Sequence, residues 1–267
     1  MPMSNHQNAS LFFNAEKQEL AIAPGAIIAD PIALAAYGQQ LRVCVGAGAR
    51  VTFSDSQLMG ETVAGYTFVL ETHSAVQYRL ELSAGGQCCA PTACMQEVPV
   101  TGVCGDRSSV SVCVILCGQQ ASFVGALCVR DVAKGTLEIN LMQQHEEPIT
   151  TSSFVVRQVL FPGLTTTVRG TIVVDKAAHH VHAEQQLRGI VVEHEKESKT
   201  SRCSETVPVS PFFCMRPTLA VANHTAVVKH GCAVGELDGE QLFYMQSRGV
   251  PIRRAKELLL AAFFACP

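Results

Sequence analysis

Residues 227–250 carry the strongest structural signal in this chain. They read Val227-Val228-Lys229-His230-Gly231-Cys232-Ala233-Val234-Gly235-Glu236-Leu237-Asp238, and then Glu240-Gln241-Leu242-Phe243-Tyr244-Met245-Gln246-Ser247-Arg248-Gly249-Val250. The first part predicts a turn rich in small residues that contains one histidine. The second part predicts a capped helix with a Leu-Phe-Tyr face, which a glycine ends.

Residues 237–267 predict two short helices in succession. Asp238 is placed to accept hydrogen bonds from the first turn, and Gln241 follows at capping-box spacing. Gly249 fits the position just past a helix end, and Pro251 opens the second helix. The apolar stripe expected on this second helix consists of Ala255, Leu258, Leu259, Ala262 and Phe263. So much apolar surface must pack on the rest of the chain or on another protein.

Upstream, from about Leu20 to Val221, the sequence predicts short strands separated by turns. Leu137, Ile139 and Leu141 alternate with polar residues, which is the period of a half-buried strand. Strands at near-regular intervals fit a sandwich, a barrel or a stacked β-solenoid. Abundant small residues, the absence of tryptophan and the lack of Asn-Gly hairpin turns favour the solenoid. The missing repeat of fixed period argues against it.

The overall composition excludes several classes of protein. The 267 residues carry a formal net charge of −3, so no basic field is present to hold nucleic acid. Only 16% of residues are charged and the mean hydropathy is +0.21, yet no apolar run approaches the roughly 18 residues that span a bilayer. The first ten residues lack the pattern of a signal peptide. We therefore expect a cytoplasmic protein that associates with other chains.

The cysteines and histidines offer weaker candidate sites. Of the twelve cysteines, Cys44, Cys113, Cys117 and Cys128 lie in apolar runs and are expected to pack as small hydrophobic side chains. Cys88, Cys89 and Cys94 are closer to a ligand set, but their spacing fits neither a zinc ribbon nor a ferredoxin. His179, His180, His182 and His194 have spacing that suits zinc, and a solvated turn explains them as well.

A set of residues in the C-terminal part resembles a known signature. It comprises Pro217, Leu219 and Val221, then His230-Gly231, Val234-Gly235 and Leu237-Asp238, then Glu240-Gln241-Leu242-Phe243-Tyr244, Ser247-Arg248-Gly249, Ala255, Leu258-Leu259 and Phe263. In this order they resemble the C-terminal signature of the SufB/SufD family, the scaffold subunits of the SUF iron–sulfur cluster assembly machine. Residues 169–174, 183–188 and 190–192 resemble the preceding coils. The match is specific from about Arg157 to Phe264.

This resemblance implies a right-handed parallel β-helix over residues 1–236 and a helical segment for partner docking over residues 237–267. It implies a non-catalytic, SufD-like scaffold that pairs with a SufB-like subunit and a SufC-like ATPase, while the choice between homodimer and heterodimer stays open. A transient iron–sulfur cluster is expected at a subunit interface. The chain has no phosphate-binding loop, so we expect no nucleotide to bind to it.

Two departures from the family pattern bear on the site. Val228 stands where the family usually has a cysteine, and by comparison with the family we expect the long N-terminal region to be shortened here. The candidate residues for cluster assembly are His230 and Cys232, because imidazole and thiolate both suit iron and residues i and i+2 share a face of an extended segment. The family match implies docking of the ATPase through Leu242, Phe243, Tyr244, Met245, Arg248, Leu258 and Phe263. We assign no resident metal.

Two functions from other classes compete with this assignment. A stand-alone metal-binding or storage protein would use the cysteines and histidines as ligands. A β-helix enzyme acting on polysaccharides would need clustered carboxylates, which are sparse in the predicted strands.

Overall fold

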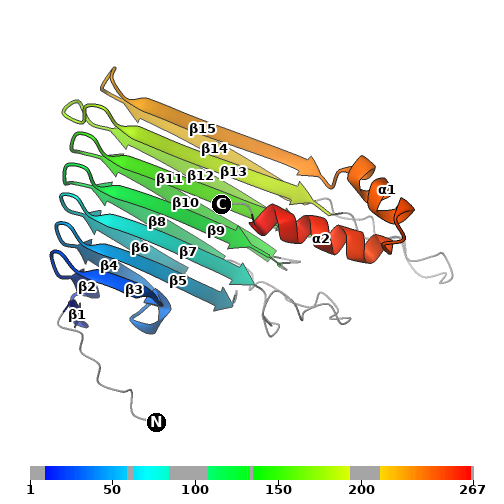
Figure 1. Cartoon of the computed structure of the whole chain (residues 1–267), viewed down its shortest axis with the longest axis horizontal. Helices are drawn as coiled ribbons and strands as arrows, with labels where there is room; N and C mark the ends of the chain where they lie inside the picture. Colours follow the sequence, from blue (N-terminus) through cyan, green and yellow to red (C-terminus); the bar gives the residue numbers. More distant parts are fainter. Residues whose placement is uncertain are drawn as a thin grey trace, which may run out of the picture.

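The computed structural model describes residues 10–58, 63–83, 108–130, 132, 135–192 and 211–265. Its strands alternate between two sheets as the chain proceeds, and neighbouring strands within each sheet run parallel, except at the first pair (Figure 1). One sheet, called here the even sheet, has the order β1-β2-β4-β6-β8-β10-β12-β14. The other, called the odd sheet, has the order β15-β13-β11-β9-β7-β5-β3. The chain is therefore a two-sheeted parallel β-solenoid, which confirms the predicted fold class, while its right hand stays a prediction.

The strands of the even sheet are β1 (Leu11–Asn14), β2 (Glu19–Ile22), β4 (Gln40–Val45), β6 (Val63–Leu70), β8 (Ser108–Leu116), β10 (Gly135–His145), β12 (Leu164–Val174) and β14 (Phe212–Val221). Those of the odd sheet are β3 (Ile27–Ile32), β5 (Arg50–Leu58), β7 (Ala75–Ser83), β9 (Ser122–Val129), β11 (Thr151–Leu160), β13 (His182–Val191) and β15 (Val227–Glu236). A short 3-10 helix spans Leu34–Ala36. Two α-helices follow the last strand, α1 (Gly239–Ser247) and α2 (Ile252–Ala265).

The core lies between the two sheets, because alternate residues of each strand face the other sheet. In β8, for example, every second residue is buried and its neighbours are half-buried. Aromatic rings stack along the interior, where Phe68 lies 5.7 Å from Phe53 and 5.4 Å from Phe123 between ring centroids. Gly125 makes room for this stack, since a Cβ there would lie 2.7 Å from the rings of Phe123 and Phe154.

One end of the solenoid has a repeated turn that the sequence conceals. Before most strands of the odd sheet, one residue adopts a left-handed conformation, and these residues are Gly25, Gly48, His73, Gln120, Ile149 and His180. Each donates its backbone N–H to the turn of the next coil, as Ile149 does to His179 O at 2.8 Å. The connections at the opposite end differ in length, so the turns recur at unequal intervals and no fixed period appears in the sequence.

Of the four cysteines expected to be packed, the structure buries only Cys128. Cys44, Cys113 and Cys117 are half-buried, and the first two occupy positions of β4 and β8 that face away from the other sheet. The expectation was wrong for Cys44 and Cys113 because an apolar run in a solenoid strand also supplies the outer face, while Cys117 follows β8 and its thiol lies 3.3 Å from Leu70 O. Burial raises the pKa of all four thiols, which favours the neutral form.

The helix signals are borne out locally. Asp238 Oδ1 accepts hydrogen bonds from the backbone of Glu240 at 2.9 Å and of Gln241 at 3.4 Å. Gly249 follows α1 with φ +84°, a conformation that favours glycine, and Val250 N closes the turn on Met245 O at 3.1 Å. No helix in the described part of the chain is long and apolar enough to cross a membrane.

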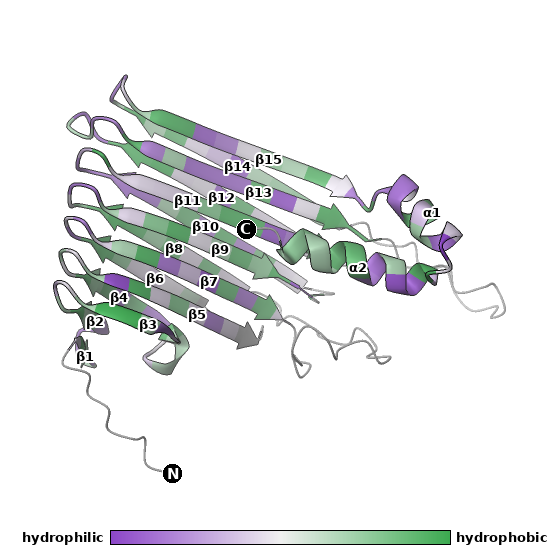
Figure 2. Cartoon of the chain, viewed as in Figure 1, coloured by the Kyte–Doolittle hydropathy of each residue, from purple (hydrophilic) through white to green (hydrophobic). Residues whose placement is uncertain are grey.

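Helix α2 packs on the outer face of the odd sheet. Its first turns are polar and its C-terminal half is apolar (Figure 2). Phe264 is buried against Cys128 and Val159, with Leu260 and Phe263 packed beside them. The predicted stripe is therefore wrong at Leu258, which is 37% exposed, and at Ala262, which is also exposed. The sheet selects a face that includes Leu260 and Phe264 instead.

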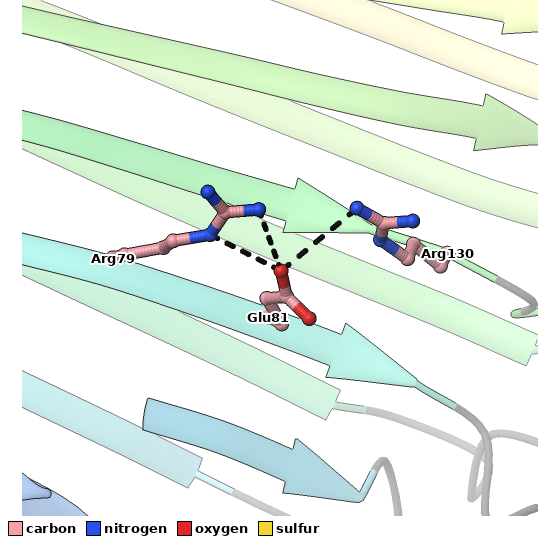
Figure 3. A network of polar contacts seen from close by, with 3 residues as sticks. All are labelled: Arg79, Glu81 and Arg130. Atoms are coloured by element: carbon pink, nitrogen blue, oxygen red, sulfur yellow. Dashed lines mark hydrogen bonds and ion pairs between the residues drawn. The ribbon is translucent and has the colours of Figure 1, made fainter. Parts of the chain in front are cut away.

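A polar network lies on the odd sheet (Figure 3), and it adjoins the α2 contact through Arg130, which lies 4.1 Å from the ring centroid of Phe264. Arg79 donates to Glu81 Oε1 from Nη2 at 2.8 Å and from Nε at 3.1 Å. Arg130, just after β9, approaches the same oxygen at 3.8 Å. Both arginines and the glutamate are partly exposed, so we expect their ion pairs to contribute little to stability on their own.

Candidate functional site

His230 lies in the middle of a strand, where the sequence predicts a turn. It pairs with Gln185 in the parallel register of β13 and β15, and Cys232 pairs with Leu187. Small residues surround His230, but β13 supplies a full set of hydrogen-bonding partners for an extended chain. The predicted turn is therefore wrong, and its cause is the pairing with β13.

The strand places His230 and Cys232 on one face, as expected of residues i and i+2. Gln185 and Leu187, their partners in β13, are buried residues that face the even sheet. His230 and Cys232 therefore also face inward, at the last coil of the solenoid. His230 is half-buried and Cys232 is exposed, because no described strand covers this end.

The last coil leaves an open apolar end. Strands β14 and β15 are the last described strands of the two sheets, and few residues in either strand are more than half-buried. Leu219 and Val234 occupy inward-facing positions and are each 49% exposed. A groove of about 310 Å³ lies over β13 and β15, lined by residues 184–188 and 229–233. The free edges and the groove together form the open surface on which His230 and Cys232 lie.

Burial sets the protonation of the imidazole. It lowers the pKa of His230 below its usual value of 6.5, so the ring is neutral at physiological pH. Both ring nitrogens are buried and have no hydrogen-bond partner among the described residues. A neutral ring is the form that binds metal ions.

A chain of buried polar side chains runs through the interior toward His230, and sequence reasoning missed it. Its members are His145, Thr150, Ser152, Gln143 and Gln185, all of which are fully or almost fully buried. The signal was present in the sequence. The alternation of Leu137, Ile139 and Leu141 continues in phase through Gln143 and His145, so these polar residues had to face the core.

The hydrogen bonds within this chain of polar side chains are short. His145 lies 2.7 Å from Thr150 Oγ1 through Nδ1 and 2.8 Å from Ser152 Oγ through Nε2. Gln143 Nε2 donates to Ser152 Oγ at 2.7 Å, and Gln185 Nε2 donates to Gln143 Oε1 at 3.0 Å. Burial lowers the pKa of His145 to about 4, so its ring is neutral as well.

The predicted docking residues divide into two groups. Phe243 and Tyr244 of α1 are 72% and 60% exposed, and the Arg248 guanidinium lies 5.3 Å from the Tyr244 ring centroid. Leu258 also faces solvent in part, whereas Leu242 and Met245 are half-buried. Phe263 packs against the cluster under α2, so its side chain already contacts residues of its own chain and is not free for a partner.

The remaining predicted ligand groups are not assembled into a site. His179 and His180 lie in a turn, and the first of them is 2.9 Å from Asn223 Nδ2 through its Nδ1 atom. Cys88, Cys89, Cys94 and His194 lie outside the described residues. Within the ranges that the structure describes, no group of three or more His, Cys, Asp or Glu side chains is arranged to hold a metal ion.

Comparison with known proteins gives one match. Residues 212–263 match the family model described as "SUF system FeS cluster assembly, SufBD core domain". These residues comprise β14, β15, α1 and nearly all of α2, so they contain the open coil with His230 and Cys232. No curated protein matches the chain.

Proposed function

From the match of residues 212–263 to the SufBD core family model, we propose that the chain is a SufD-like scaffold subunit of a SUF iron–sulfur cluster assembly complex. It pairs with a SufB-like subunit through the open coil and with a SufC-like ATPase through its helices. A nascent cluster forms transiently at the interface with the SufB-like subunit. The proposal treats the cluster as cargo rather than as a resident cofactor.

The observation that carries this proposal is the position of His230 and Cys232 on the open last coil. The outer edges of β14 and β15 pair with no other strand among the described residues, and strands with free edges readily pair with another chain. Apolar side chains such as Leu219 and Val234 are exposed between these edges. A second solenoid that extends both sheets would cover them and would bury the imidazole and the thiol at the junction.

The chemistry of the two side chains suits this role. Imidazole nitrogen and thiolate sulfur are ligands of iron in proteins. His230 is already neutral, so iron does not have to displace a proton from a charged ring. Two donors are too few to hold iron firmly, which is what the transfer of a cluster to another protein requires, and the partner subunit supplies the rest.

The SufD-like assignment rests on the sequence His230-Gly231-x-x-Val234-Gly235, with Val228 where a cysteine usually stands in the family. Cys232 is the thiol nearest along this strand and is exposed. Gly231 adjoins both candidate residues, and nothing described lies within 4 Å of the Cβ that a larger residue would place there. The edge beside the site is thus open to a close approach by a partner backbone.

Co-expression with the neighbouring SufB-like and SufC-like chains tests the proposal. The complex is purified anaerobically and assayed for iron and acid-labile sulfide after cluster assembly. His230→Ala is expected to leave complex formation intact and to lower the cluster content severalfold. His224→Ala changes an exposed histidine in the turn of the same coil and serves as the matched control, with wild-type content.

Two outcomes would contradict the proposal. Failure of the chain to co-purify with either the SufB-like or the SufC-like chain would show that the proposed complex does not form. Iron bound by the isolated chain without sulfide, and unaffected by a SufB-like partner, would instead support a stand-alone metal-binding or storage protein.

A further inference from the structure

The hydrogen bonds of the buried polar chain have a fixed order of donors and acceptors. Thr150 Oγ1 donates its proton to the carbonyl oxygen of Glu147 at 3.1 Å, and a carbonyl oxygen can only accept. Thr150 therefore accepts from His145 Nδ1–H, which leaves His145 Nε2 as an acceptor for the Ser152 hydroxyl. These proton positions are assigned from the hydrogen-bond pattern, starting from the acceptor-only carbonyl of Glu147.

A second carbonyl fixes the orientation of the Gln143 amide. Gln143 Nε2 lies 3.3 Å from the carbonyl oxygen of Glu184 and 2.7 Å from Ser152 Oγ. If the Gln143 amide were reversed, its oxygen would lie next to the carbonyl oxygen of Glu184, and neither atom could donate a hydrogen bond. Gln143 Oε1 consequently faces Gln185, and Gln185 must present its NH2 group to it.

The donor-to-acceptor order of the hydrogen bonds in this buried polar chain thus extends to Gln185. It leaves the side-chain oxygen of Gln185 as the terminal acceptor. Gln185 is fully buried, and its Oε1 atom has no hydrogen-bond partner among the described residues. Leaving such an acceptor unsatisfied is costly. The next residue in the same column of the odd sheet is His230, whose two ring nitrogens are also buried and unpaired within the described part of the chain.

Gly170 of β12 provides the space in which these groups meet. A Cβ at this position would overlap Gln185 Oε1 and would lie 3.3 Å from His230 Nε2. The glutamine oxygen and this ring nitrogen therefore lie over the same glycine. Neighbouring strands are about 4.8 Å apart, so the register of β13 and β15 places the side chains of Gln185 and His230 within reach of each other.

We propose that Gln185 is a positioning residue for His230, because the buried polar chain makes its Oε1 atom an obligatory acceptor for the Nε2–H group of the imidazole. This holds the neutral ring in the tautomer in which Nδ1 carries the free lone pair. The inference deepens the proposed function and rests on it in one respect: Nδ1 is then the nitrogen that binds iron of the nascent cluster. The polar chain transmits this constraint from Glu147 and Glu184, two coils or less from the open end.

Nuclear magnetic resonance of the full-length chain labelled with 15N-histidine tests the inference without any cluster. The 15N shifts of His230 report which ring nitrogen carries the proton, and His230→Ala assigns them. The wild type is expected to show the Nε2–H tautomer, with an imidazole proton that exchanges slowly because it is hydrogen-bonded. Gln185→Leu removes the acceptor and is expected to shift the tautomer ratio by about tenfold, the size of one net hydrogen bond.

Gln186→Leu is the matched control. Gln186 neighbours Gln185 on β13 but is only half-buried and bonds to Glu184, so the His230 signals should keep their wild-type positions. Gln143→Leu supplies a second variant, since it frees the Gln185 amide to turn and is expected to move the ratio in the same direction. Either variant serves if the other fails to fold.

Three results would overturn the inference. They are an Nδ1–H tautomer of His230 in the wild type, a rapidly exchanging Nε2 proton, and equal tautomer ratios in the wild type, Gln185→Leu and Gln186→Leu. Failure of the proposed function is distinguishable from these. In that case the tautomer of His230 would depend on Gln185, while His230→Ala would leave cluster assembly in the complex unchanged.

Discussion

The guanidinium of Arg130 lies 4.1 Å from the ring centroid of Phe264, so the end of β9 holds the last turn of α2. The same ring covers Cys128, which is 3% exposed. A cation over an aromatic face contributes about 0.5–2 kcal/mol, depending on its exposure. The contact stabilises the packing of α2 on the solenoid. Because the Phe264 ring covers Cys128, the accessibility of this thiol reports whether α2 is packed in place.

Phe264→Ala should therefore expose Cys128 to thiol reagents. Loss of a buried phenyl ring typically costs about 3–5 kcal/mol, so we expect the rate of Cys128 labelling to rise at least tenfold, as measured by peptide mass spectrometry. Cys232, exposed in the wild type, gives an internal reference for a reactive thiol. Phe243→Ala, in the exposed part of α1, should leave the Cys128 rate unchanged, and a rate insensitive to Phe264→Ala would mean that α2 does not protect this thiol.

Gly170→Ala should destabilise the solenoid. The added methyl group would overlap the buried Gln185 oxygen, and overpacking of this kind costs about 1–3 kcal/mol. Denaturant unfolding should show this loss in the free energy of unfolding. Gly231→Ala adds the same methyl group where nothing lies within 4 Å, so a change within about 0.5 kcal/mol is expected there. Equal effects of the two changes would contradict the packing around Gly170.

Stability should fall on mild acidification because of His145. Its pKa is about 4 in the folded chain against 6.5 as the ordinary value, so between these pH values the unfolded chain binds a proton that the folded chain does not. The contribution of the neutral ring is complete above pH 6.5 and is lost as the pH falls toward 4, by up to about 3 kcal/mol. His145→Gln should flatten this part of the stability curve, whereas His224→Gln, at an exposed turn, should retain the wild-type slope.

Ile149→Asn should stabilise the chain. Ile149 has φ +61° and its side chain is 51% exposed, and a β-branched residue is strained in this conformation. Asparagine tolerates it and keeps the backbone N–H that bonds to His179 O. We expect a gain of about 0.5–1 kcal/mol in the free energy of unfolding. Ile149→Val retains the branch and should give no gain, so equal stabilities of the two variants would exclude relief of strain.

The combined change Phe243→Ala and Tyr244→Ala should weaken binding of the SufC-like ATPase by at least about tenfold, because exposed aromatic side chains of this kind carry interface energy. Isothermal titration calorimetry with the purified ATPase measures it. Phe12→Ala, an exposed aromatic at the opposite end of the solenoid, should bind normally. Truncation after Gly235 is a less selective test, since it also strips Phe264 from Cys128 and Val159. Undiminished binding by the double variant would move the docking surface elsewhere.

Local signals were sufficient for the helices. Asp238 and Gly249 act on backbone groups within one turn of their own position, so the boundaries of α1 could be predicted from neighbouring residues. The turn expected at His230 failed for the opposite reason. Gly231 and Gly235 permit a turn, but the backbone of β13 pairs with the whole segment, and that strand lies a full coil earlier in the sequence.

By itself, the sequence determined that this chain builds a series of strands, that two helices follow, and that His230 and Cys232 share a face, because these properties depend on alternation and on adjacent residues. Only the tertiary structure decided that Gln143 meets Gln185, 42 residues away, that α2 covers Cys128, and that no described strand covers the coil with His230. The physical reason is that a solenoid stacks coils whose connections differ in length. Contacts between coils therefore follow strand register and leave no regular trace in the sequence.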